Sequence, residues 1–161
     1  MPGLPPLIEE DMQLLDGALD DLLRQSEAAA ALIIDKGGPL VSQRGAVENF
    51  DTTTIAALAA GSFCATQAIA ERVGETNFSN IYQQGEHYSV LFCNIDEDVL
   101  LIIIFKAGLS VGAIKYYAAT TVSEINGQLQ KARQRSPGTS LDLVSMNVLD
   151  AASIFRKGPP V

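Results

Sequence analysis

Residues 50–74 read FDTTTIAALAAGSFCATQAIAERVG and predict one long helix, around which the rest of the chain is organised. Asp51 is well placed as the N-cap, because its carboxylate can accept hydrogen bonds from the free N–H groups of the first turn. Gly74 suits the helix end, since glycine readily adopts the left-handed conformation that closes many helices.

Two lines of side chains run along this predicted helix at helical spacing. One holds the larger apolar residues with two small ones between them: Ile55, Leu58, Ser62, Ala65, Ile69 and Val73. The other holds only small side chains: Ala57, Gly61, Cys64 and Ala68. A glycine inside a helix costs about 1 kcal/mol relative to alanine. Something is therefore expected to approach closely at Gly61, either the protein's own sheet or a second protein, and periodicity alone favours the sheet.

The composition predicts one soluble globular domain with an acidic surface. The chain has 161 residues, is 47% hydrophobic and carries a net charge of −8. Residues 1–51 hold ten acidic and three basic side chains, whereas residues 106–161 hold three and seven. The acidic total argues against nucleic acid as the main partner. The polar ends of the helix at 50–74 argue against a membrane span, and the start MPGLPPLIEED does not resemble a signal peptide.

The two cysteines, Cys64 and Cys93, are far apart and match no metal-binding or CxxC spacing. We interpret both as buried free thiols in a reducing compartment, and we expect a cytoplasmic protein.

The remaining pattern predicts an α/β (α+β) sandwich, a five-stranded antiparallel sheet covered by helices in the order α-β-β-α-β-β-β-α. Helices are expected at 7–25, 50–74 and from Ser110 to about Arg135, and strands at 28–35, 40–44, 78–84, 87–95 and 98–106. The seven consecutive apolar residues of 99–105 place the last strand in the middle of the sheet.

Residues 1–135 are thus expected to form the domain, and residues 136–161 a linker and tail. The linker is Ser136–Ser140, and apolar residues from Leu141 to Phe155 recur at rough helical spacing. Such a segment either packs on its own domain or docks in a groove elsewhere, and the pattern does not distinguish the two.

No catalytic constellation is apparent. The only histidine, His87, stands beside a predicted turn without a nucleophile motif, and no phosphate-binding loop is present. The carboxylate groups at 9–11 and 96–98 lack the alternating spacing of a calcium loop. We expect no cofactor and no metal ion, and a protein that works by binding.

Several segments together resemble one family. They are 35–38 in the first turn, 51–53 with the alanine-rich helix, 73–75 with Phe78, and 99–105 followed by 110–112. In this order they resemble the roadblock / dynein light chain domain family, with the closest match to bacterial MglB-type regulators of a Ras-like GTPase, MglA. The resemblance covers about residues 9–135.

The resemblance implies a homodimer, or a higher oligomer, that binds a Ras-like small GTPase. In the family the central helix packs against its mate and the third strand pairs with its mate, so that one continuous sheet forms. The matching dimer-interface residues here are Ile55, Leu58, Ser62, Phe78, Asn80, Tyr82 and Gln84. The GTPase docks on the paired central helices, and the matching face is Ala57, Gly61, Cys64 and Ala68. This reverses the preference drawn from periodicity.

The resemblance also implies a mechanism. MglB-type proteins stimulate GTP hydrolysis by repositioning the GTPase's own residues, without an arginine finger. The alternatives are a non-activating roadblock scaffold and, from a different class, a small-ligand sensor. The tail differs from the acidic tails of some relatives, because it carries only Asp142 and Asp150 beside Arg156 and Lys157.

Overall fold

The computed structural model describes the backbone of residues 3–154 and the side chains of residues 3–135. Its elements, in chain order, are α1 (Glu9–Ser26), β1 (Ala30–Asp35), β2 (Leu40–Gly45), the 3-10 turn η1 (Val47–Asn49), α2 (Thr52–Arg72), β3 (Asn80–Gln83), β4 (Tyr88–Asn94), β5 (Val99–Lys106) and α3 (Val111–Ile154). The predicted order of three helices and five strands is confirmed.

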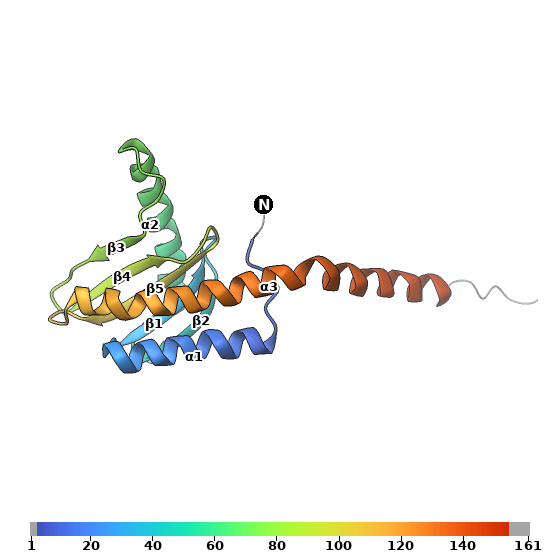
Figure 1. Cartoon of the computed structure of the whole chain (residues 1–161), viewed down its shortest axis with the longest axis horizontal. Helices are drawn as coiled ribbons and strands as arrows, with labels where there is room; N and C mark the ends of the chain where they lie inside the picture. The colour runs from blue at the N-terminus through green and yellow to red at the C-terminus, as the bar shows by residue number, and fades with distance from the viewer. Residues whose placement is uncertain (1–2, 155–161) are drawn as a thin grey trace, which may run out of the picture.

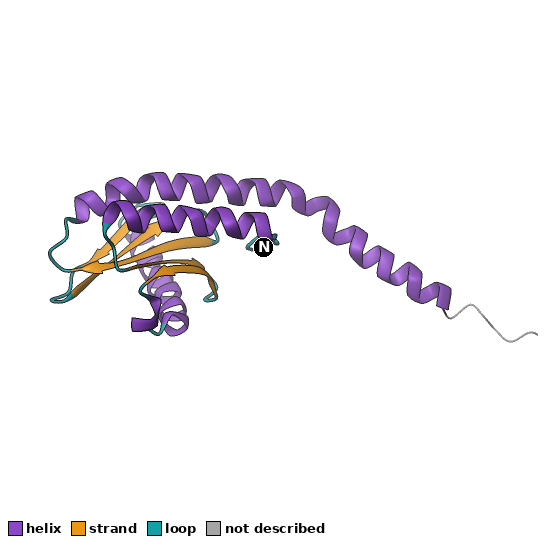
Figure 2. Ribbon diagram, turned by 90° about the horizontal axis from the view of Figure 1, so that it is seen from below, coloured by secondary structure: helices purple, strands orange, loops and turns teal. Residues whose placement is uncertain are grey.

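The molecule has three layers, with one five-stranded antiparallel sheet between two layers of helices (Figure 1). The strands lie in the order β2-β1-β5-β4-β3. Figure 2 shows α1 and α3 side by side on one face of the sheet and α2 on the opposite face. The sheet therefore has two edges, β2 and β3.

β5 occupies the centre of the sheet, as its apolar sequence predicts. It pairs with β1 on one side and with β4 on the other. Seven of its eight residues are buried, and only Lys106 at its end is exposed. A strand covered on both faces has no need for polar side chains, which explains the unbroken apolar run.

Alternation along the strands divides the core into two clusters. Ile33 of β1 and Leu101 of β5 face α1 and α3. Leu32 of β1 and Ile102 of β5 face α2. The α1–α3 cluster takes long side chains from its helices, such as Leu15 and Leu19, whereas α2 contributes mainly alanines.

A buried carboxylate joins the start of α1 to α3. Asp11 is 0% exposed and accepts hydrogen bonds from the Ile8 backbone N–H at 2.9 Å and from Gln128 at 2.6 Å. Arg135 lies 2.5 Å from both of its oxygens. Burial by itself raises the pKa of Asp11, but the hydrogen bonds from Arg135, Ile8 and Gln128 outweigh it and lower that pKa.

α3 continues as helix to Ile154, well past Arg135, where we predicted its end. The backbone of the predicted linker Ser136–Ser140 is therefore helical. Proline removes one hydrogen bond and costs roughly 3 kcal/mol in a helix, but it does not forbid the helix on either side of it. Figure 2 shows that α3 bends in its C-terminal half, beyond the sheet. The domain boundary at 135 stays a prediction, and the tail's side chains lie outside the described part of the chain.

Candidate partner-binding surface

α2 begins and ends close to the predicted limits. The carboxylate of Asp51 caps the helix by accepting hydrogen bonds from the N–H and the hydroxyl of Thr54. These bonds lower the pKa of Asp51. Gly74, just after the helix, has φ +82°, a conformation that residues with a side chain rarely adopt.

The face of α2 that packs on the sheet coincides with neither of the two predicted lines, although half-buried Ile55 of the larger line also packs against it. It consists of Ala56, Ala59, Ala60 and Phe63, all buried against the α2 side of the core. The small-residue line does not pack on the sheet, so that interpretation of it is wrong. A Cβ added at Gly61 would meet nothing within 4 Å. The helix is apolar on all sides, and its periodicity therefore carries little information about which side is buried.

All four residues of the predicted GTPase face, Ala57, Gly61, Cys64 and Ala68, are exposed on the outer side of α2. The expectation of two buried cysteines is therefore half wrong. Cys64 on α2 is exposed, whereas Cys93 on β4 is buried. Burial raises the pKa of the Cys93 thiol to about 12.

The predicted dimer residues lie on α2 and along β3. On α2, Leu58 is 67% exposed, while Ile55 and Ser62 are half-buried. Around β3, Phe78 is half-buried and Asn80, Tyr82 and Gln84 are exposed. Tyr82 stacks on Phe105 at 6.2 Å, on the side of the sheet that faces α1 and α3. The two groups therefore lie on opposite sides of the sheet, and β3 is an open edge between them.

Much of α2 is an apolar surface without a cover. Beyond Phe63 only Ala70 is buried, and Figure 1 shows the last turns of α2 extending past the sheet. Leu58, Ile69 and Val73 expose more than half of their surface. Within the described residues, α2 is also the one helix long and apolar enough to cross a membrane, with 28% of the window buried, which is weak evidence by length and composition alone.

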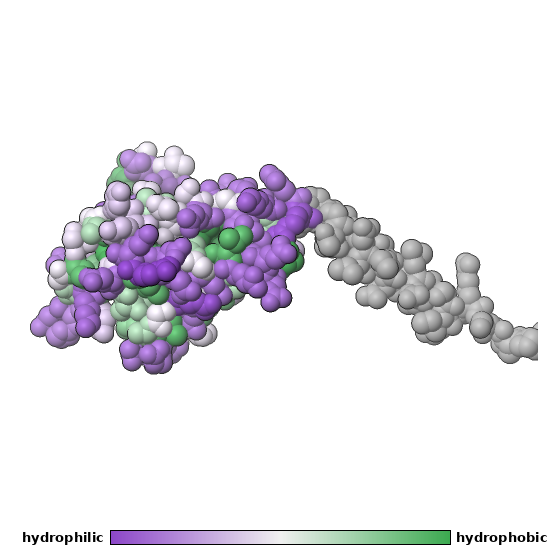
Figure 3. All heavy atoms as spheres, turned by 60° about the horizontal axis from the view of Figure 1, so that its bottom comes forward, coloured by the Kyte–Doolittle hydropathy of each residue, from purple (hydrophilic) through white to green (hydrophobic). Residues whose placement is uncertain are grey.

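The opposite helical layer presents a different surface. Figure 3 shows the face that carries α1 as mostly hydrophilic, with small separate apolar patches. Exposed charges on α1 include Glu10, Asp20 and Asp21. Of the two helical layers, α2 is thus the one with an extended apolar exterior.

A cavity of about 530 Å³ opens beside the second half of α2. It lies between α2, the segment that follows α2, the turn after β1, and the end of β4 with the turn that follows it. Lys36 donates to Asn94 Oδ1 at 2.7 Å and to the carbonyl of Asp96 at 2.6 Å, with its ammonium 4.8 Å from the centre of the Phe63 ring. Burial lowers the pKa of Lys36, although Asp96 and Asp98 act in the opposite direction.

The turn between β4 and β5 is held from both faces of the sheet. The carboxylate of Asp96 accepts from the backbone N–H groups of Asp98 and Val99 and from Arg133 of α3. The sequence predicts this segment only as a turn and gives no indication of the cavity. No periodic signal indicates it, because its walls come from a helix, the segment after that helix, and turns that are far apart in the sequence.

No group of three or more histidine, cysteine or acidic side chains suited to a metal ion occurs among the residues that the structure describes. His87 is exposed, and Asp11 and Asp96 are engaged in capping and turn contacts.

Comparisons with known proteins agree with the fold. The Roadblock/LC7 domain model matches residues 14–105. The chain is similar to Myxococcus xanthus MglB, with TM-score 0.75 and 27% identity over 79% of this chain and 96% of that chain. It is also similar to the gliding protein MglB of Thermus thermophilus, with TM-score 0.75 and 25% identity over 81% of this chain and 99% of that chain. A Roadblock/LC7 domain from Streptomyces avermitilis shares the fold, with TM-score 0.65 and 16% identity over 71% of this chain and 97% of that one. None of the curated proteins compared with the chain matches it.

Proposed function

Because the chain belongs to the Roadblock/LC7 domain family, we propose that it is a homodimeric regulator of a Ras-like, MglA-type small GTPase and acts in the cytoplasm. The observation that carries the proposal is the uncovered apolar exterior of α2, on which Leu58, Ile69 and Val73 are exposed. Contiguous exposed apolar surface on a folded protein usually marks an interaction site.

The second copy is proposed to cover part of this surface. Two α2 helices would pack through the line that contains Ile55, Leu58 and Ser62. Each β3 edge would pair with the β3 of the other copy, which satisfies its free N–H and C=O groups and removes an aggregation-prone edge. A solved MglB has a tetrameric arrangement, so the proposal extends to assemblies larger than the dimer.

The GTPase is proposed to dock on the small-residue line of Ala57, Gly61, Cys64 and Ala68. Small side chains let a partner's backbone approach the helix closely. The regulator would stimulate hydrolysis by stabilising the arrangement of the GTPase in which its own residues hold the attacking water and the γ-phosphate. This mechanism needs binding energy from α2 and no catalytic group from the regulator.

The test is GTP turnover by a Ras-like GTPase from the same genome, measured with increasing amounts of this protein. We expect at least a ten-fold rise, which corresponds to about 1.4 kcal/mol of barrier. No rise, with a complex that forms equally in GDP and GTP, would favour the alternative of a non-activating scaffold. No complex at all would contradict both.

The docking surface is tested with Cys64→Arg and Ala68→Arg, both at exposed positions of α2. Each should abolish the complex and leave the thermal unfolding of the regulator unchanged. Ala119→Arg is the matched control, because Ala119 is an equally small, exposed residue on α3, on the other side of the sheet. Binding that survives both α2 substitutions would rule out this face. Light scattering on the same samples reports the oligomeric state.

A further inference from the structure

α2 is held on the sheet mainly by small side chains. Its buried sheet-facing residues are Ala56, Ala59, Ala60 and Phe63, and only Phe63 is large. An alanine face forms shallow ridges, so it restricts rotation and sliding of a helix less than an interlocked large side chain does. Half-buried Ile55 packs near the start of the helix, which leaves Phe63 as the last large contact before α2 extends past the sheet.

The part of α2 that follows Phe63 has little support of its own. Among residues 64–72 only Ala70 is buried. Gln67 donates to Asn77, which ties this part of the helix to the segment that follows it. Within the described residues, no side-chain hydrogen bond or ion pair joins residues 64–72 to the sheet. The orientation of these last turns therefore depends on how α2 is held at Phe63.

Lys36 holds the Phe63 ring from the other side of the cavity. Its ammonium lies 4.8 Å from the centre of the ring, and the face of an aromatic ring attracts a cation. The same ammonium donates to Asn94 Oδ1 at 2.7 Å and to the carbonyl of Asp96 at 2.6 Å. Arg133 of α3 holds the Asp96 carboxylate at 3.1 Å, so Lys36 connects α2 to a part of the fold that is itself fixed.

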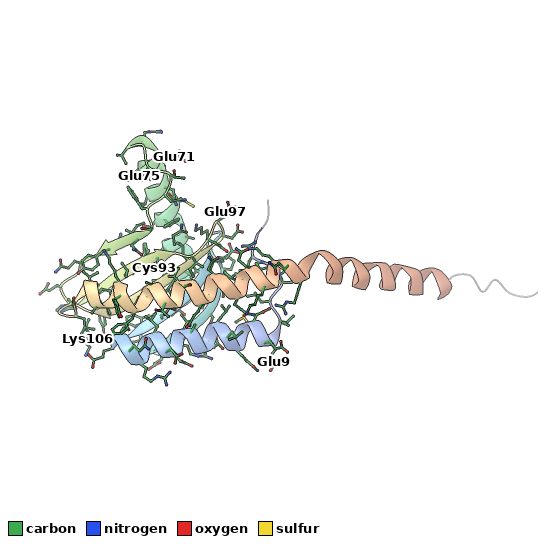
Figure 4. The ribbon with its side chains drawn as sticks, viewed as in Figure 1. Glu9, Glu71, Glu75, Cys93, Glu97 and Lys106 are labelled. Carbon is green, nitrogen blue, oxygen red and sulfur yellow. The ribbon has the colours of Figure 1, made fainter. Side chains whose placement is uncertain are left out.

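This point of support lies next to the proposed docking surface. Cys64 follows Phe63 in the chain, belongs to the GTPase face and lines the same cavity as Lys36. Ala68 of that face lies one turn further along, toward the last turns of α2, which Figure 4 shows with Glu71 extending past the sheet. A small rotation of α2 at Phe63 would therefore move half of the GTPase face.

We propose that Lys36 is a positioning residue for the GTPase: by holding the Phe63 ring, it fixes the orientation in which the second half of α2 presents the GTPase face. Lys36 acts in the free regulator, before the partner binds. A surface that is already ordered binds more tightly, because less conformational freedom is lost in the complex. This inference rests on the proposed function and assigns a role to a residue outside the four that form the docking face.

The first test is amide hydrogen exchange of the free protein at one fixed concentration. Lys36→Met removes the charge and the donors but keeps the apolar stem, whereas Lys36→Arg keeps a cation with donors. We expect Lys36→Met to speed exchange at least five-fold in residues 64–72 and less than two-fold in residues 52–60, and Lys36→Arg to resemble the unaltered protein. Loss of overall stability would speed exchange in both halves of α2. Equal changes in the two halves, or no change in either, would overturn the inference.

The second test is the affinity of the GTP-bound GTPase for the same variants and for a matched control, Lys106→Met. Lys106 is exposed at the end of β5, and Figure 4 shows it at the opposite end of the sheet from Glu97 of the cavity lining. We expect Lys36→Met to weaken binding five-fold or more. Lys36→Arg and Lys106→Met should each change the affinity less than two-fold. Equal affinities for Lys36→Met and Lys106→Met would overturn the inference and leave the proposed function intact.

A double-mutant cycle with Phe63→Leu separates positioning from a direct contact of Lys36 with the GTPase. If Lys36 acts through the ring, the double variant should bind no more weakly than the weaker of the two single variants. Effects that multiply would indicate a direct contact of Lys36 with the partner and would overturn the positioning role. Absence of a complex with the unaltered protein would overturn both this inference and the proposed function.

Discussion

Replacement of Asp11 by asparagine tests how the two helices on one face of the sheet are held together. Asp11 is completely buried, and its two oxygens receive donors from the Ile8 backbone, Gln128 and Arg135. An asparagine of the same shape keeps one acceptor oxygen but introduces an N–H₂ group that faces these donors.

The expected cost follows from the contacts that are lost. A hydrogen bond to a charged group contributes about 1.5–3 kcal/mol, and the cap on the Ile8 N–H about 1 kcal/mol. Arg135 has 41% of its side chain exposed, so its ion pair with Asp11 is partly screened and adds little beyond its hydrogen bonds. We therefore expect Asp11→Asn to destabilise the protein by about 2–3 kcal/mol, a decrease in Tm of roughly 5–12 °C for a domain of this size.

The effect should depend on pH in one direction. The pKa of Asp11 is lower in the folded state than its unfolded value of 3.8, so the carboxylate stabilises the fold at pH values above that value. This stabilisation is lost as the pH falls through the folded pKa. The difference between wild type and Asp11→Asn should therefore be constant near pH 7 and shrink below about pH 4.

The assay is urea unfolding at pH 7 and pH 3, at one fixed protein concentration because association stabilises folded oligomers. Glu10→Gln is the control, since it removes an exposed carboxylate from the same first turn of α1 and should cost at most about 1 kcal/mol through the helix dipole. An equal decrease in the free energy of unfolding for Asp11→Asn and Glu10→Gln at pH 7 would refute the role assigned to the buried carboxylate.

Three further outcomes are expected. Phe63→Ala, which removes a ring that is 2% exposed, should destabilise the fold by about 3–5 kcal/mol in chemical denaturation, and a cost below 1 kcal/mol would contradict its place in the core. A thiol reagent at pH 8 should modify exposed Cys64 and leave Cys93 unmodified until the protein unfolds, because burial raises the pKa of Cys93 to about 12. Mass spectrometry of peptides identifies the modified cysteine, and modification of Cys93 before Cys64 would contradict this prediction. Leu58→Arg should convert the proposed dimer to monomer in light scattering without lowering monomer stability, since Leu58 is 67% exposed, and an unchanged mass would rule out this contact.

The sequence predicts the sheet more reliably than it predicts the role of each face of α2. β5 is recognisable because an apolar run too short for a buried helix has few alternatives to a central strand. α2 is different, because nearly every position is small or apolar and no polar face marks the side that meets water. Ala56, Ala59 and Ala60 face the sheet because small side chains let α2 pack closely on it. Periodicity does not reveal which of several apolar faces packs in this way.

Contacts between distant segments were equally hard to foresee. Glu9, Glu10 and Asp11 look alike as first-turn acids, yet only Asp11 is buried under Arg135. Lys36 belongs to a recognisable turn, but of its partners Asn94 ends β4 and Asp96 lies in the turn that follows. Side chains of this kind acquire their roles only when the tertiary fold brings their partners within hydrogen-bond distance.

The position of β5 also has a consequence for how the chain folds as it is synthesised. β1 with β2, and β3 with β4, are adjacent pairs that can form locally as hairpins. β5 is translated after all of them, yet it alone joins β1 to β4. Until β5 emerges from the ribosome, the two hairpins are not joined, and the edges of β1 and β4 that β5 will pair with are free. Unpaired strand edges of this kind can associate with neighbouring chains. The five-stranded sheet therefore forms in one late step that pairs β1 with a strand far away in the sequence. A nascent chain that ends before Val99 lacks β5 and cannot join the two hairpins.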